Sequence, residues 1–123
     1  TWLRTMMGSY EDFWTITRDA LAYTLKTIGL EADQKHFDEI AEAYNNLTPY
    51  PDAKEALIAL SGYRLAILSN GNTGMLNALT KNSGLDKYLE SWISVDSMKA
   101  FKPDPRAYEP VRKALGLEVD EVL

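Results

Sequence analysis

An apolar run that stops abruptly constrains the fold of this chain more than any other feature. Leu65 to Leu68 carry no polar interruption, and Ser69, Asn70 and Gly71 follow at once. A short continuous apolar run bounded by turn residues is typical of a strand that is covered on both faces, as in parallel sheets. We therefore expect a buried strand over 64–68.

The segments around this run alternate between helix and strand patterns. Apolar residues recur at helical spacing over 51–62, 73–81 and 104–116. Short β-rich runs at 92–95 and at Val119, Val122 and Leu123 predict two further strands. This order builds a parallel sheet with helices on its faces. The sequence thus predicts an α/β fold in which residues 48–123 form part of a doubly wound, Rossmann-like core.

The first part of the chain, residues 1–47, shows helical patterns and no strand signal. Gly8 and Ser9 interrupt the pattern, and we expect Ser9 to cap a new helix with Asp12 at its third position. A second helix is predicted over 33–44, and 45–51, with two Asn and two Pro, reads as a connector. The fold class is therefore a partial doubly wound core with an all-helical segment before it.

The composition excludes several classes of function. The net charge is -5 and the basic residues are dispersed, which argues against a nucleic-acid partner or an anionic membrane surface. The chain has no cysteine, so a disulfide framework, a thiolate nucleophile and a Cys-ligated metal are excluded. No apolar run approaches the length of a membrane span, and no signal peptide pattern is present. A cytoplasmic location is the default expectation.

The residues at the end of the predicted strand point to an anion site. Ligands of open parallel sheets bind beyond the carboxyl ends of the strands. Ser69 and Asn70 lie at such an end, before a helix whose free N–H groups favour an anion, and Gly71 supplies conformational freedom for a tight turn. A hydroxyl, an amide and backbone N–H groups can hold a carboxylate or phosphate oxygen. The alternative is that Ser69 and Asn70 only form a turn and a helix cap.

The loop after the next strand favours the anion site. Lys102 stands between Phe101 and Pro103, shortly after the strand predicted at 92–95. Parallel strands place their C-terminal loops at the same edge of the sheet, so Lys102 and Ser69 can converge on one pocket. A lysine on a constrained backbone suits a fixed cation beside an anionic group. The alternative is an ordinary exposed loop lysine.

Several motifs resemble one family. Leu68 to Gly71, Ser94 to Asp96 and the run from Phe101 to Tyr108 are similar to the haloacid dehalogenase superfamily, and within it to the (S)-2-haloacid dehalogenases, the type II L-2-haloacid enzymes. Thr1 to Arg4 and the pair Phe13-Trp14 show the same resemblance. The resemblance implies an N-terminally truncated helical cap subdomain over 1–47 and a C-terminally truncated part of the α/β hydrolase core over 48–123.

The resemblance also implies roles for individual residues. Ser69 and the Asn70 backbone would bind a substrate carboxylate, Lys102 would pair with a nucleophilic Asp, and Tyr108 matches a position that is important for activity. Phe13 matches a cap aromatic that walls the pocket around the halogen-bearing carbon. A core position for Tyr108 and ordinary helix packing for Phe13 are the alternatives. No metal or other cofactor is implied, because the substrate is a monoanion.

The family pattern also extends beyond this sequence. The resemblance implies a nucleophilic Asp and a halide-binding Arg upstream of Thr1, and a further motif downstream of Leu123. We therefore expect an internal fragment, inactive by itself, of an enzyme that converts (S)-2-haloalkanoic acids to (R)-2-hydroxy acids through an aspartyl ester. A homodimer of the full-length protein is left open, since dimers are common among relatives.

Two other functions share part of the pattern. A Mg²⁺-dependent small-molecule phosphatase of the same superfamily would share Ser69 and Lys102. A catalytically dead binding module of the same fold would keep the architecture without the chemistry. The small-molecule haloacid substrate is the partner that the full set of motifs favours.

Overall fold

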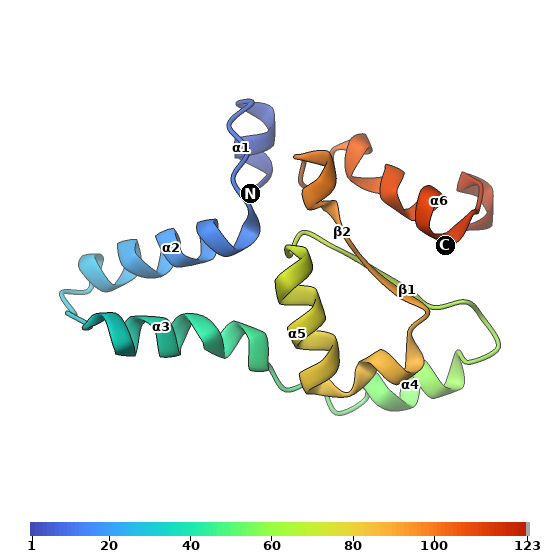
Figure 1. Ribbon diagram of the computed structural model, residues 1–123, viewed down its shortest axis with the longest axis horizontal. Coiled ribbons are helices and arrows are strands. Elements are labelled where there is room, and N and C mark those ends of the chain that lie inside the picture. Colours follow the sequence, from blue (N-terminus) through green and yellow to red (C-terminus); the bar gives the residue numbers. More distant parts are fainter. Residues whose placement is uncertain (123) are drawn as a thin grey trace.

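The computed structural model describes residues 1–122, without the side chain of Val119. Helical residues 1–46 lie beside a two-stranded sheet and its helices (Figure 1). The elements, in chain order, are α1 (Trp2–Met6), α2 (Phe13–Thr27), α3 (Gln34–Glu42), η1 (Ala43–Asn46), α4 (Ala53–Ala59), β1 (Ala66–Ser69), α5 (Thr73–Ser83), η2 (Leu85–Tyr88), β2 (Ser91–Ser94), η3 (Val95–Met98), η4 (Pro105–Tyr108), α6 (Glu109–Leu115) and η5 (Val119–Glu121).

The two strands pair in parallel, as the alternation of helix and strand patterns predicts. Ala66 pairs with Ser91 and Ser69 pairs with Ser94, so the strands end together at one edge. Helices α5 and α6 both contact β2, and Figure 1 shows them on either side of the strands. The α/β architecture with a parallel sheet and flanking helices is therefore confirmed.

Strand β1 is less covered than its apolar sequence predicts. Ile67 and Leu68 are half-buried and Ala66 is exposed, so the expectation of a strand buried on both faces is wrong for this structure. Within residues 1–122, β2 is the one strand that pairs with β1, which leaves the other edge of β1 without a strand beside it.

The junction between α1 and α2 differs from the prediction. Ser9 belongs to the end of α1 and does not cap α2. Its backbone N–H donates to the Arg4 carbonyl oxygen, and the backbone N–H of Gly8 donates to the Thr5 carbonyl oxygen. With Gly8 at a φ of 67°, these bonds form a Schellman ending for α1. Asp12 caps α2 instead, since its Oδ1 accepts from the backbone N–H groups of Trp14 and Thr15.

The predicted strand at the end of the chain is also not observed. Residues 119–121 form the short helix η5, and Leu123 lies outside the described residues. The N–H of Glu118 donates to Oε2 of Glu121, and the N–H of Glu121 donates back to the Glu118 carbonyl oxygen. This reciprocal pair closes residues 118–121 into a single turn where the sequence pattern predicts the start of a strand.

The helical residues and the sheet share a small apolar core. Val95, Phe101 and Ala107 are fully buried, and Tyr10, Phe13, Ile16 and Leu68 pack against them. Tyr10 comes from the α1–α2 junction, Phe13 and Ile16 come from the start of α2, and Leu68 comes from β1. The core thus lies between the helical segment and the carboxyl edge of the sheet.

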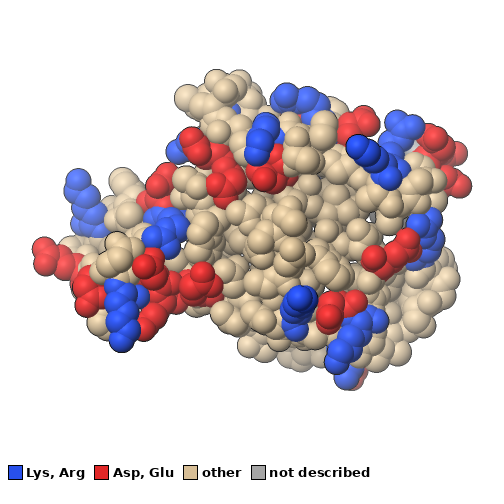
Figure 2. Space-filling model, in the orientation of Figure 1, with Lys and Arg blue, Asp and Glu red and all other residues tan. Residues whose placement is uncertain are grey.

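The surface carries charges of both signs. On the face shown in Figure 2, basic and acidic side chains are interspersed and no continuous basic area forms. Among the described residues, no helix combines the length and the apolar character that a membrane crossing requires.

Truncating the central core side chain tests this packing. Phe101 is 0% exposed, and Phe101→Ala should lower the free energy of unfolding by about 3–5 kcal/mol, because the cavity adds to the lost burial. Urea unfolding followed by circular dichroism measures the change. Tyr63→Ala, at a side chain that is 72% exposed, is the control and should stay within about 0.5 kcal/mol of the wild type. Equal effects of the two changes would contradict a core centred on Phe101.

Candidate active site

The carboxyl edge of the sheet brings together the loops that follow β1 and β2. Ser69 and Ser94 stand opposite each other in the strand register. The Ser94 hydroxyl donates to the Gly71 carbonyl oxygen at 2.7 Å and accepts from the N–H of Asp96 at 3.0 Å. Ser94 therefore ties the first turn after β1 to the first turn after β2.

Lys102 reaches this edge through two hydrogen bonds. Its backbone N–H donates to Oδ1 of Asn70 at 2.9 Å, and its Nζ donates to the Leu68 carbonyl oxygen at 2.7 Å. The Lys102 side chain is half-buried, and the peptide bond to Pro103 is cis. Among residues 1–122, no carboxylate lies within ion-pair distance of its ammonium group. Lys102 therefore lies beside the Ser69–Asn70 turn, as the sequence predicts. Its ammonium group has no acidic partner among residues 1–122.

Ser69 and Asn70 keep hydrogen-bond donors for a ligand. The Ser69 hydroxyl oxygen accepts from the N–H of Gly71 at 3.1 Å, which leaves the hydroxyl hydrogen to be donated. Asn70 uses Oδ1 to accept from Lys102, so its Nδ2 group retains two N–H donors. Neither donor has an acceptor among the described residues. Two neutral donors and one ammonium group are a chemical set that suits an anion.

Gly71 plays a different part from the one expected. Its backbone does not lie in the left-handed region, so the turn does not require the conformational freedom of glycine. A Cβ atom added there would lie 3.4 Å from Cδ2 of Leu76 and 3.5 Å from Oγ of Ser69, which is ordinary contact. The buried backbone of Gly71 serves instead as donor to Ser69 and acceptor for Ser94.

Phe13 and Tyr108 differ in their relation to the apolar core. Phe13 is the first residue of α2 and packs against the cluster of Val95, Phe101 and Ala107. Tyr108 ends η4, and its side chain is 47% exposed, which excludes a core position within this structure. No hydrogen bond within residues 1–122 joins Tyr108 to Ser69, Asn70 or Lys102. The catalytic and binding roles of all five residues stay predictions.

Tyr10 is a residue of this region that the sequence patterns did not reveal. Its hydroxyl donates to Oδ1 of Asp96 at 2.8 Å, and its ring stacks on Phe101 with ring centroids 4.8 Å apart. Burial of the phenol, reinforced by the hydrogen bond to Asp96, raises the pKa of Tyr10 well above its usual range. Asp96 also pairs with Lys99 at 3.0 Å. The Tyr10–Asp96 bond spans 86 positions, so no local pattern could indicate it.

Asp12 is a second residue whose importance only the structure reveals. Its Oδ1 accepts from Nδ2 of Asn72 at 2.8 Å, in addition to the amides that it caps, and its Oδ2 accepts from the Thr15 hydroxyl at 2.6 Å. Partial burial alone would raise the pKa of Asp12, but the bonds from Thr15, from Asn72 and from the helix amides lower this pKa below its ordinary value. The sequence placed Asp12 in a capping context but gave no sign of its distant partner.

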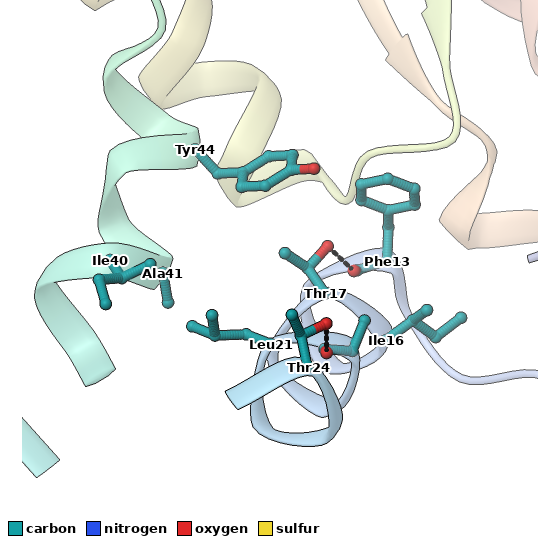
Figure 3. A pocket seen from close by; sticks show the side chains of 9 residues that line it. Phe13, Ile16, Thr17, Leu21, Thr24, Ile40, Ala41 and Tyr44 are labelled. Atoms are coloured by element: carbon teal, nitrogen blue, oxygen red, sulfur yellow. Dashed lines mark hydrogen bonds between the residues drawn. The ribbon is translucent and has the colours of Figure 1, made fainter. Parts of the chain in front are cut away.

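A separate apolar pocket lies within the helical segment. Figure 3 shows Phe13 and Tyr44 at its rim, with the Thr17 hydroxyl turned back to the Phe13 carbonyl oxygen at 2.8 Å. Its lining comes from α2, α3 and η1: Phe13, Ile16, Thr17, Ala20, Leu21, Thr24, Ile40, Ala41 and Tyr44. Phe13 is thus shared between this pocket and the core beside Lys102.

The titratable groups of the described residues do not assemble a metal site. No three or more His, Asp or Glu side chains of residues 1–122 come together in a group that could hold a metal ion. The expectation that the reaction needs no metal stays a prediction, which chelation can test.

Sequence comparison identifies the family. A family model of haloacid dehalogenase-like hydrolases matches residues 1–123, and the chain belongs to this family of hydrolases. The (S)-2-haloacid dehalogenase of Xanthobacter autotrophicus is 51% identical over 123 residues, which are 100% of this chain and 49% of that protein. The (S)-2-haloacid dehalogenase 4A of Burkholderia cepacia is 46% identical, over 99% of this chain and 54% of that protein. The chain spans about half the length of these curated relatives.

Solved structures agree with this assignment. The structure of L-2-haloacid dehalogenase from Xanthobacter autotrophicus matches 95% of this chain and 48% of its own, with a TM-score of 0.88 and 51% identity. A second structure of that enzyme, with chloropropionic acid covalently bound, matches equally well. The resemblance that the motifs indicate is therefore confirmed, and none of these proteins is named as a phosphatase.

The pH dependence of stability tests the Asp12 cap. Asp12→Ala should lower the free energy of unfolding by about 0.5–2 kcal/mol at neutral pH, as for other N-caps. Because the pKa of Asp12 is lower in the folded protein than in the unfolded chain, its contribution is complete above about pH 4 and is lost as pH falls through the folded pKa. Urea unfolding at neutral and at acidic pH should show the wild type and the variant converging as pH falls.

The control for this measurement is Asp52→Ala. Asp52 occupies the N-cap position of α4, but its side chain accepts no capping hydrogen bond. Its removal should leave stability nearly unchanged at every pH. A difference between wild type and Asp12→Ala that persists undiminished in acid would contradict a contribution from the ionised carboxylate.

Proposed function

We propose that the complete protein that contains this chain hydrolyses (S)-2-haloalkanoic acids to (R)-2-hydroxy acids through an ester intermediate. The observation that carries the proposal is the meeting of Lys102 with the Ser69–Asn70 turn at the carboxyl edge of the sheet. The identity of 51% to an (S)-2-haloacid dehalogenase, and the structure of such an enzyme with chloropropionic acid covalently bound, support the substrate class.

The substrate carboxylate is expected at the end of β1. The Ser69 hydroxyl hydrogen, the Nδ2 group of Asn70 and backbone N–H groups of the turn are donors of the kind that a carboxylate accepts. Holding the carboxylate there fixes C2 of the substrate, which bears the halogen, with respect to Lys102. The contribution of this turn is therefore orientation of the substrate.

Lys102 supplies positive charge beside the reacting carbon. The family resemblance implies a nucleophilic Asp from another strand of the complete protein, and the ammonium group of Lys102 would keep that carboxylate ionised and oriented. In the first step the carboxylate oxygen forms a bond to C2, and the carbon–halogen bond breaks with its electron pair leaving on the halide. In the second step water attacks the ester carbonyl, the acyl–oxygen bond breaks, and the 2-hydroxy acid and the free carboxylate are released.

The helical segment completes the site in this proposal. Residues 1–47 act as a cap over the core of residues 48–123, and Phe13 provides an apolar wall near the halogen-bearing carbon. Tyr108, exposed at the start of α6, acts beside Lys102. Phe13 packs against the buried cluster that contains Phe101, the residue directly before Lys102, and this packing supports its placement near the site.

The reaction is tested directly on the complete protein. We expect one chloride ion and one (R)-lactate molecule to be released for each (S)-2-chloropropionate consumed, with an undiminished rate in EDTA, because the ester route uses protein groups alone. Ion chromatography and chiral chromatography measure the two products. Turnover that requires added Mg²⁺, or that acts on phosphate esters and spares the haloacid, would contradict the proposal and support a phosphatase.

Substitutions at Asn70 separate binding from structure. Asn70→Asp keeps an oxygen to accept from the N–H of Lys102 but replaces the two donors of Nδ2 with negative charge. It should therefore raise KM at least about tenfold, the cost of losing roughly 1.4 kcal/mol of binding, while the free energy of unfolding changes little. Initial rates over a range of (S)-2-chloropropionate concentrations measure KM.

Two further variants control the Asn70 experiment. Asn70→Ala also removes the acceptor of the Lys102 N–H and should lower the free energy of unfolding by about 1–3 kcal/mol. Ser97→Ala, at an exposed serine of η3, should change neither property. An Asn70→Asp protein with an unchanged KM would exclude the side chain of Asn70 from carboxylate binding.

A further inference from the structure

The N-termini of two helices from distant parts of the chain are joined through their caps. Asp12 caps α2 and Asn72 caps α5, where Oδ1 of Asn72 accepts from the N–H of Met75 at 2.9 Å. The Nδ2 group of Asn72, which the cap does not use, donates to Oδ1 of Asp12 at 2.8 Å, across 60 positions of the chain. Each side chain thus caps its own helix and binds the cap of the other.

This bond connects two places that the proposed reaction uses. Asp12 directly precedes Phe13, the aromatic expected to wall the pocket, and Asn72 directly follows Gly71, the last residue of the turn that carries Ser69 and Asn70. Side chains adjacent to a fixed backbone position have little freedom to shift independently of it. A side-chain hydrogen bond therefore joins the residue beside Phe13 to the residue that follows the carboxylate-binding turn.

Two polar links from α1 and the α1–α2 junction reach a different loop, while Asn45 and Asn46 at the far end of the helical segment accept from Asn82 in α5. The hydroxyl of Tyr10 bonds to Asp96, and the N–H of Phe101 donates to Oγ1 of Thr5 at 2.9 Å. Both contacts hold the segment to residues 95–101, after β2. Within residues 1–122, the hydrogen bond of Asp12 to Asn72 is the link from α2 to the turn after β1.

The electrostatics favour this pair as a fixed connection. The Asp12 carboxylate lies at the N-terminus of α2, which has 15 residues, and beside the N-terminus of α5, which has 11 residues. The partial positive charge at the start of each helix stabilises an anion in that position. The lowered pKa of Asp12 is consistent with an ionised carboxylate at neutral pH, which accepts from Asn72.

We propose that Asp12 and Asn72 are positioning residues for the reaction, because their hydrogen bond sets Phe13 against the turn that binds the substrate carboxylate. The inference rests on the proposed function and adds a role for two residues that do not touch the substrate. Their effect should appear in the chemical step, since a displacement of about 1 Å in a positioning contact can cost about a hundredfold in rate.

An exchange of donor and acceptor tests the proposal. Asn72→Asp keeps a good N-cap for α5 but sets two carboxylates against each other, and it should lower kcat/KM for (S)-2-chloropropionate by about 10- to 100-fold. The double variant Asp12→Asn with Asn72→Asp restores an amide donor facing a carboxylate acceptor, with both helices still capped. It should recover to within a few-fold of the wild type.

A matched control tests whether a new negative charge on helix α5 is by itself enough to lower kcat/KM. Asn77→Asp makes the same substitution on the same helix, where the new carboxylate can still accept from Nε1 of Trp92, which donates to Asn77 at 2.7 Å. This variant should retain the kcat/KM of the wild type. If Asn72→Asp and Asn77→Asp behave alike, or if the double variant fails to recover activity while folding normally, the positioning role is overturned.

A readout that does not depend on turnover separates this inference from the proposed function. Failure of the wild-type protein to release chloride would refute the proposed reaction alone. Crystal structures of the wild type and of Asn72→Asp then measure the distance from the Phe13 ring to Lys102 directly. A displaced ring supports the inference, and an unmoved ring overturns it whatever the substrate is.

Discussion

Parallel pairing of β1 with β2 is the constraint on which the site depends. Because the two strands end in register, with Ser69 opposite Ser94, the loops that follow them start from the same edge. The Ser94 hydroxyl then joins these loops across the edge, and Lys102 returns from its own loop to the Leu68 carbonyl oxygen. An antiparallel pairing would send the two loops to opposite ends, and no cation could meet the Ser69–Asn70 turn.

The helical segment is attached to this edge by two kinds of interaction with different consequences. Burial around Phe101 supplies most of the free energy, since a buried aromatic ring contributes about 3–5 kcal/mol and a hydrogen bond about 1 kcal/mol net. Apolar contacts have no strict direction, however, so they hold the segment without fixing its register. The bonds of Tyr10, Asp12 and Thr5 require particular atoms at particular distances. Packing therefore accounts for attachment, and the polar links account for placement.

Patterns with a short period in the sequence predicted most of the fold. Helical spacing and the run from Leu65 to Leu68 gave the helices, the strands and their parallel order, and the sheet edge gave the proximity of Lys102 to Ser69. The failures have local physical causes. Ser9 closes α1 because the left-handed Gly8 directs its N–H backward, and Glu121 folds residues 119–121 into a turn. The bonds of Tyr10 and Asp12 span 86 and 60 positions, and such contacts depend on how whole elements dock, which spacing does not encode.

Asn70 joins the turn after β1 to the backbone of Lys102. Its Oδ1 holds the backbone N–H of Lys102, so the amide cannot rotate to present that oxygen elsewhere, and its Nδ2 donors remain for a ligand. Ser69 is arranged in the same way, because accepting from Gly71 leaves its hydroxyl hydrogen as the group to be donated. The side-chain oxygens of Ser69 and Asn70 thus accept hydrogen bonds from the backbone of the protein, and their O–H and N–H groups stay available to a ligand. A turn organised in this manner presents N–H and O–H donors of the kind that an anionic ligand accepts.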